Sequence, residues 1–192
     1  MANKVKFGLK NVHYAVATIG DDGTATYGTP KPWPGAVNLS MDAQDEEITF
    51  RADNTDYYTG FANNGYSGDY ESALIPDDFR SDVLGEVANG DLLVETDTNA
   101  NKHFALLFEF DGDVSATRHV FYNCTASRPA VAGQTTEQTI TPTTEKITIA
   151  AKSIYSEPIN KNIVKARCKD TESVTYTGWY TSVKQPVGSV TT

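Results

Sequence analysis

Long apolar runs are missing from this chain of 192 residues. No stretch approaches the roughly 18 consecutive apolar residues that a membrane-spanning helix needs, so we expect no membrane association. The first residues carry Lys4 and Lys6 but no apolar run, and we therefore expect no secretory signal and synthesis in the cytoplasm. The length predicts a single domain over residues 1–192.

Residues that hold metals or perform covalent chemistry are few and scattered. Cys124 and Cys168 belong to no CxxC pair, which favours two buried free thiols, although a disulfide between them stays open. His13, His103 and His119 lack partners at metal-ligand spacing, and neither a GxSxG motif nor a phosphate-binding glycine loop occurs. We therefore expect no metal, no cofactor and no enzymatic activity.

Basic residues are nearly absent from the middle of the chain. Between Met41 and Asp97 there are 15 of the 25 acids but only Arg51 and Arg80 as bases, a formal charge of −13 in a chain of −9. Such a block repels the phosphates of nucleic acids and permits pairing with a basic surface on a neighbour. An ordinary solvated acidic face explains the same composition.

Most of the chain has the residue pattern of β-strands, which predicts a mainly β fold of the sandwich or barrel kind. In the first strand the apolar phase changes around Lys10-Asn11, which indicates a bulge, and Asp111-Gly112 predicts a hairpin turn. We expect Val174–Tyr180 to cover a sheet edge and residues 181–192 to be poorly ordered. The predicted strands are Lys4–Ile19, Val37–Met41, Glu47–Arg51, Leu92–Glu95, His103–Phe110, Val114–Cys124, Glu145–Ala150 and Asn162–Cys168.

One short helix is predicted over residues 76–84. Pro76 opens it, Asp77 and Asp78 lie where the helix dipole favours anions, and Gly85 ends it. Because so short a helix is marginal alone, we expect it to flank a sheet.

The segment Asp53–Ser67 is predicted to be a long loop or arm. It carries four aromatic residues among small polar ones: Tyr57, Tyr58, Phe61 and Tyr66. Exposed aromatics in such an arm favour a contact with another subunit, and a loop that covers its own core is the alternative.

A basic cluster near the C-terminus offers a partner for the acidic block of a neighbouring subunit. Its members are Lys161, Lys165, Arg167 and Lys169. Solvent-facing positions on an edge strand explain the same alternation.

The sequence resembles the major tail protein family of long-tailed, siphovirus-type bacteriophages that infect Gram-positive bacteria. The similarity runs from Lys4 to Ile154 and is carried by residues 4–15, Gly35–Leu39, the acidic run before Ile48-Thr49-Phe50, and His119–Pro129. It implies a β-sandwich with a flanking helix, rings of six copies, and stacked rings that form a tail tube for DNA ejection.

The resemblance also implies partners and a place. The partners would be other copies of the chain, tape measure, tail terminator and distal tail proteins, and DNA in transient passage. The protein would be assembled in the host cytoplasm and reside in the virion. Six acids are candidates for an electronegative lumen or an interface: Asp42, Asp45, Glu46, Glu47, Asp69 and Glu71. The alternative is a β-sandwich module that binds a glycan or receptor, with the arm aromatics, Trp33 and Trp179 stacking on sugars.

Overall fold

The protein is built mainly from antiparallel strands, which confirms the predicted fold class. The computed structural model describes residues 7–98, 100–113, 115–133, 135 and 142–188. In chain order the elements of the described chain are β1 (Leu9–Ile19), β2 (Ala25–Tyr27), β3 (Lys31–Pro32), β4 (Ala36–Ala52), β5 (Thr55–Ser72), α1 (Asp77–Asp82), β6 (Val87–Asn89), β7 (Leu92–Val94), β8 (His103–Phe110), β9 (Arg118–Ala126), β10 (Glu145–Lys152), β11 (Ile154–Ser156), the short helix η1 (Glu157–Ile159), β12 (Lys161–Ile163), β13 (Lys165–Cys168) and α2 (Val174–Thr177).

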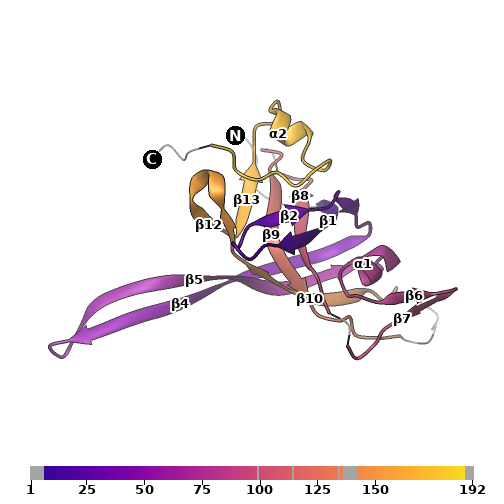
Figure 1. The fold of residues 1–192 in the computed structure, drawn as a ribbon, viewed down its shortest axis with the longest axis horizontal. Helices are drawn as coiled ribbons and strands as arrows, with labels where there is room; N and C mark the ends of the chain where they lie inside the picture. The colour runs from indigo at the N-terminus through magenta and orange to yellow at the C-terminus, as the bar shows by residue number, and fades with distance from the viewer. Residues whose placement is uncertain (1–6, 99, 114, 134, 136–141, 189–192) are drawn as a thin grey trace.

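One large sheet organises the fold (Figure 1). Its strands follow the order β2-β1-β8-β9-β10-β5-β4, and β3 pairs with β1. The second edge of β9 is divided between two strands. Strand β10 pairs with its end at residues 123–126, and β13 pairs with its beginning at residues 118–121. The sheet therefore forks at β9. The described chain also has two separate two-stranded sheets. One is formed by β6 and β7, and the other by β11 and β12.

The two ends of the large sheet curl toward each other around an aromatic core. Trp33 follows β3, and its backbone N–H donates a hydrogen bond of 2.7 Å to the carbonyl of Val12 in β1. Its ring lies 6.1 Å from that of Tyr14 in β1 and 4.7 Å from that of Tyr70 in β5. The segment between β3 and β4 thus bridges the two ends, and the predicted sandwich or barrel is realised as a single curled sheet.

Helix α1 packs into this inner core. The side chains of Phe79 and Val83 are completely buried, and the Phe79 ring lies 5.0 Å from the ring of Tyr14. Gly85, just after the helix, has a φ of +77°, a conformation that glycine adopts without strain. The helix predicted over residues 76–84 is confirmed, slightly shorter at both ends.

A second core covers the opposite face of the sheet. The C-terminal segment crosses this face with Trp179 buried in it. The hydroxyl of Tyr122 donates to the carbonyl of Lys184 over 2.8 Å, and Gln185 donates to the carbonyl of Ala25 over 2.9 Å. Residues 181–188 have no regular secondary structure, and residues 189–192 lie outside the described residues.

Several strand predictions are confirmed and one pair is merged. Strand β8 has the predicted bounds, and the predicted bulge lies where the β1–β8 register shifts between Lys10 and His13. The stretches Val37–Met41 and Glu47–Arg51 are both parts of β4. They join because pairing with β5 continues through a register shift between Ala43 and Asp45. Val114, the predicted start of the β9 strand, lies outside the described residues.

The segment Asp53–Ser67, predicted to be a long loop or arm, is not a loop. Apart from a two-residue turn, the segment is strand β5 paired with β4. Asp53 and Asn54 form the turn with φ values of +52° and +62°, the left-handed region that Asp and Asn tolerate. The Tyr, Thr and Phe residues after this turn are of the types that favour strands. The pair Asp53-Asn54 was therefore the sequence signal for a hairpin.

A second helix was not predicted. Val174–Tyr180, expected to cover a sheet edge, begins with α2, and the Ser173 hydroxyl accepts a capping hydrogen bond from the Tyr176 backbone N–H at 3.1 Å. Serine is a preferred N-cap because its oxygen satisfies an otherwise free amide. The turn that follows places Trp179 against the face of the sheet, not along its edge.

Candidate interaction surfaces

Strands β4 and β5 form a hairpin that projects far from the rest of the fold (Figure 1). Strand β10 pairs with β5 only between Ser72 and Tyr66. Beyond that point β4 and β5 have only each other as strand partners in the described chain. We call this two-stranded part, residues 45–63, the distal arm. At about 3.3 Å per residue each of its strands spans roughly 30 Å.

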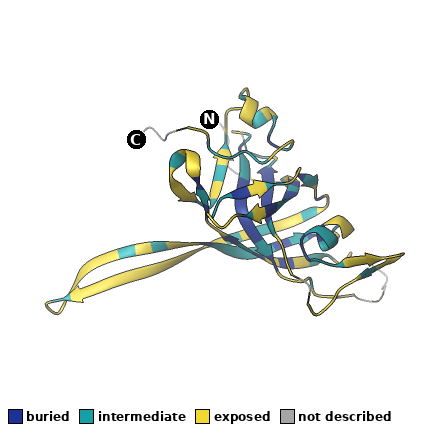
Figure 2. Ribbon diagram, in the orientation of Figure 1, coloured by how far each residue is buried: buried dark blue, intermediate teal, exposed yellow. Residues whose placement is uncertain are grey.

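Most of the distal arm is exposed (Figure 2), and large apolar side chains lie on both of its faces. The exposed fractions range from 51% to 74% for five residues of the arm: Ile48, Phe50, Tyr57, Tyr58 and Phe61. Phe50 pairs with Tyr58 across the hairpin, so these two share one face. Phe61 pairs with Glu47 and lies on the other face. Exposed apolar residues gathered in this way are typical of a contact surface.

The distal arm is also acidic. It contains Asp45, Glu46, Glu47, Asp53 and Asp56 against a single base, Arg51. Arg51 and Asp56 form an ion pair of 3.0 Å across the hairpin, and no other acid of the distal arm has an ion pair within the described residues. The tip therefore combines aromatic surface with uncompensated negative charge.

The six predicted acidic residues do not form one surface. Asp45, Glu46 and Glu47 lie on the distal arm, whereas Asp42, Asp69 and Glu71 lie at its base. Asp69 forms a 2.7 Å ion pair with Lys146 and accepts a hydrogen bond of 2.9 Å from Thr148. The contact with Lys146 lowers the pKa of the Asp69 carboxyl, with Thr148 adding to the effect. Asp69 thus links β5 to β10 through its side chain.

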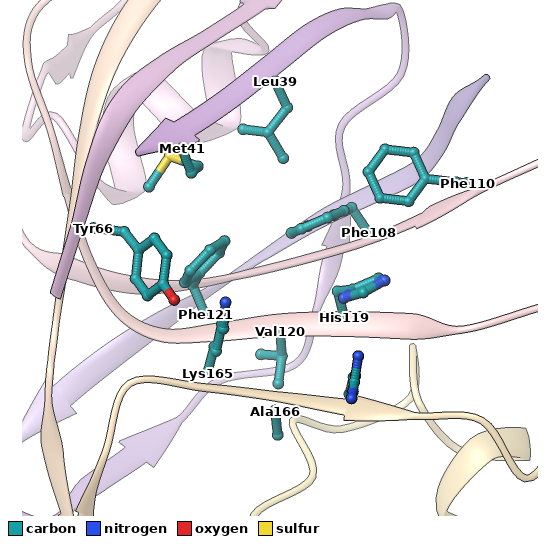
Figure 3. A pocket seen from close by; sticks show the side chains of 11 residues that line it. Leu39, Met41, Tyr66, Phe108, Phe110, His119, Val120, Phe121, Lys165 and Ala166 are labelled. Atoms are coloured by element: carbon teal, nitrogen blue, oxygen red, sulfur yellow. The ribbon is translucent and has the colours of Figure 1, made fainter. Parts of the chain in front are cut away.

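An open groove of about 700 Å³ lies where the base of the hairpin faces β8, β9 and β13 (Figure 3). Leu39, Met41 and Tyr66 line it from the hairpin, and Phe108 and Phe121 line it from the sheet. The hairpin residues are only partly buried and pack against the inner core. The groove is an open continuation of that core.

Two of the four predicted basic residues lie at this groove. Lys165 and Arg167 alternate on β13, and their register partners on β9 are Phe121 and His119, so both side chains lie on the groove side. Both are exposed, and neither forms an ion pair within the described chain. Lys161 and Lys169 are also exposed but do not line the groove.

Tyr66 does not belong with the other predicted arm aromatics. It lies at the base of the hairpin, where its ring is 5.3 Å from that of Phe121 and 4.2 Å from the Lys165 ammonium nitrogen. Ile48, Phe50 and the apolar groove walls were missed by sequence reasoning. Their alternation predicted strands, and no local signal distinguishes a groove wall from a filled core.

The described residues show no cluster of three or more histidine, cysteine or carboxylate side chains that could hold a metal ion. His103 has its Nδ1 2.6 Å from the Asn123 amide oxygen, and His119 stacks on Phe108 with ring centres 5.2 Å apart. Cys124 and Cys168 are both free, and burial raises the pKa of the Cys124 thiol. None of the described helices is long and apolar enough to cross a membrane.

Comparison with models of protein families gave no match, and comparison with curated proteins gave none either. Among solved structures, the fold is similar to the anti-feeding prophage cap, described as a tube terminating cap. The TM-score is 0.47 and the sequence identity 9%, over 88% of this chain and 95% of that chain. The siphovirus family named from the sequence therefore stays a prediction.

Proposed function

We propose that this chain is a structural virion protein whose copies assemble into stacked rings, six to a ring, and form the tail tube of a long-tailed bacteriophage. The observation that carries the proposal is the distal arm, a projecting ribbon with five exposed large apolar residues. A two-stranded ribbon is marginal on its own in water. Exposing this much apolar surface so far from the core is best explained by a partner that covers it.

Self-assembly suits the form of the surfaces. The distal arm and the groove are different patches on one molecule, and a contact between unlike patches builds rings or filaments. Strand β4 also ends the large sheet, since it pairs only with β5 among the described residues. A free strand edge lets a neighbour continue the sheet.

The acidic residues suit a conduit for DNA. A lumen with negative charge repels phosphates, so that DNA passes without binding. Asp42 and Glu71, at the base of the hairpin, are candidates for such a lining. Asp69 lies on the same pair of strands, β4 and β5. On this proposal the chain is not an enzyme, resides in the virion after assembly in the host cytoplasm, and contacts tape measure, tail terminator and distal tail proteins.

The proposal is tested by self-assembly of the purified protein. Negative-stain microscopy and light scattering should show rings or tubes. A variant with Phe50→Ser and Tyr58→Ser should keep its circular dichroism spectrum and its urea midpoint but lose assembly, because both residues are exposed. Val174→Ser, at an apolar residue on α2 that is even more exposed than Phe50 and Tyr58, is the control and should assemble normally.

A chain that stays monomeric at every concentration would contradict a tube function. The glycan-binding alternative is weakened by the structure, because Trp33 and Trp179 are buried with exposed fractions of 1% and 2% and cannot stack on a sugar. It would return if the arm aromatics of a stable monomer bound glycans.

A further inference from the structure

The apolar groove at the base of the hairpin is open to solvent, and no described residue of its own chain fills it. Its walls include Met41 and Tyr66, partly buried residues that continue the inner core outward. A partner that covers apolar walls of this kind removes them from water, and this lowers the free energy of the complex.

The charges around the groove define the chemistry of that partner. Lys165 and Arg167 are exposed at the groove and have no carboxylate partner in the described chain. A segment that combines aromatic side chains with several carboxylates would satisfy both the walls and the rim. Complementary charge of this kind selects a partner and sets its orientation.

The distal arm has this composition. Phe50, Tyr58 and Phe61 are exposed on it, and the neighbouring Glu46 and Glu47 have no ion pair with any described residue. No other projecting element of the described chain joins exposed aromatics to a run of acids. The large apolar residues that the β6–β7 hairpin exposes are all aliphatic: Val87, Leu92 and Val94.

The arm cannot fill the groove of its own chain. Met41 lines the groove at the base of the same strand whose tip lies at Ala52, roughly 35 Å away at about 3.3 Å per residue. The hairpin extends away from the body of the fold (Figure 1), so an arm that enters the groove has to come from another molecule.

We propose that the distal arm of one copy docks in the groove of a second copy, with the arm aromatics against Met41 and Tyr66 and the arm carboxylates against Lys165 and Arg167. This inference deepens the proposed tube function by naming the acceptor surface, and it rests on that function for its setting. The contact joins unlike patches, so every copy offers one arm and one groove and the contact can propagate.

Charge-reversed full-length chains test the docking. The groove variant carries Lys165→Glu and Arg167→Glu, and the arm variant carries Glu46→Lys and Glu47→Lys. Each alone should raise the critical concentration for assembly by about tenfold or more, because like charges then face each other. Mixing the two variants should restore assembly, since each arm again meets a groove of opposite charge.

Two controls separate docking from general effects. Lys161→Glu with Lys169→Glu makes the same change of charge outside the groove and should assemble like the wild type. Arg167→Glu alone, at a side chain with no hydrogen bond or ion pair within the described residues, should retain the wild-type urea midpoint and still weaken assembly, which excludes misfolding as the cause.

The outcomes are distinguishable from those of the tube proposal, with size measured by sedimentation and particles by microscopy. Wild-type tubes together with unchanged assembly of the groove variant would overturn the docking and leave the tube function standing. Oligomers in the mixed variants without wild-type tubes would support the docking and overturn the tube. Monomers in every sample would overturn both.

Discussion

The Lys165 ammonium nitrogen lies 4.2 Å from the centre of the Tyr66 ring. The two residues belong to β13 and β5, strands that do not pair with each other, so this cation–π contact spans the fork of the sheet. Phe121 packs against the same ring at 5.3 Å. The contact thereby holds one wall of the groove in place at the base of the hairpin.

Replacing Tyr66 by Leu should remove this contact. We expect a loss of about 0.5–1 kcal/mol from the cation–π interaction, together with a smaller loss of packing on Phe121. Tyr66→Phe keeps the ring and should be nearly neutral, because the Tyr66 hydroxyl forms no hydrogen bond within the described residues. Urea unfolding of the three proteins measures the difference; equal midpoints for Leu and Phe would contradict a role for the ring.

Truncating Phe79 should be among the most destabilising single changes. Its ring is fully buried and lies 5.3 Å from that of Phe104 and 4.2 Å from that of Trp33. Phe79→Ala should cost about 3–5 kcal/mol in the free energy of unfolding, because it opens a cavity under α1. Leu74→Ala, at a residue 70% exposed, is the control and should change the value little.

A methyl group at Gly68 should disrupt the base of the hairpin. A Cβ there would lie 1.8 Å from the Ser40 carbonyl oxygen on the paired strand β4. Gly68→Ala should therefore cost at least the roughly 1–3 kcal/mol typical of overpacking and should speed amide exchange in β4. Gly133→Ala is the control, since a Cβ at Gly133 meets no atom within 4 Å. Equal stability of the two variants would show that β4 can move away freely.

Stability should fall at acid pH in part through Asp69. The Lys146 ammonium and the Thr148 hydroxyl lower the pKa of the folded Asp69 carboxyl below its ordinary value of about 3.9. A carboxyl with a lowered folded pKa stabilises above its unfolded pKa, and this contribution is lost as the pH falls through the folded value.

Asp69→Asn should therefore lower the free energy of unfolding at pH 7 and narrow the difference between variant and wild type below pH 3.9. Urea unfolding between pH 2 and pH 7 measures both. Asp42→Asn, at an acid on the same hairpin without an ion pair in the described chain, should show no such pH-dependent difference. A constant gap across that range would argue against the ion pair as the cause.

Much of the fold could be predicted because local patterns and the final structure agree. The apolar run of β8 was readable because both faces of this strand are buried. The spacing of Phe79 and Val83 was readable because residues four apart lie on one face of a helix. The second strand of the distal arm, residues 55–63, was misread because these residues lie outside any core and lack the apolar alternation by which strands are usually identified. Its aromatic and acidic composition still indicated a contact surface, which stays a prediction.

The sequence by itself determined that this protein is mainly β, with one flanking helix and an acidic middle block, because composition and periodicity act over short distances along the chain. Only the tertiary structure decided that Lys165 and Arg167 share a groove with Tyr66 while Lys161 and Lys169 do not. It also decided that the aromatics divide between the tip and the base of one hairpin. Those groupings depend on which strands pair and where the sheet forks, and long-range register of that kind is set by packing across the whole fold.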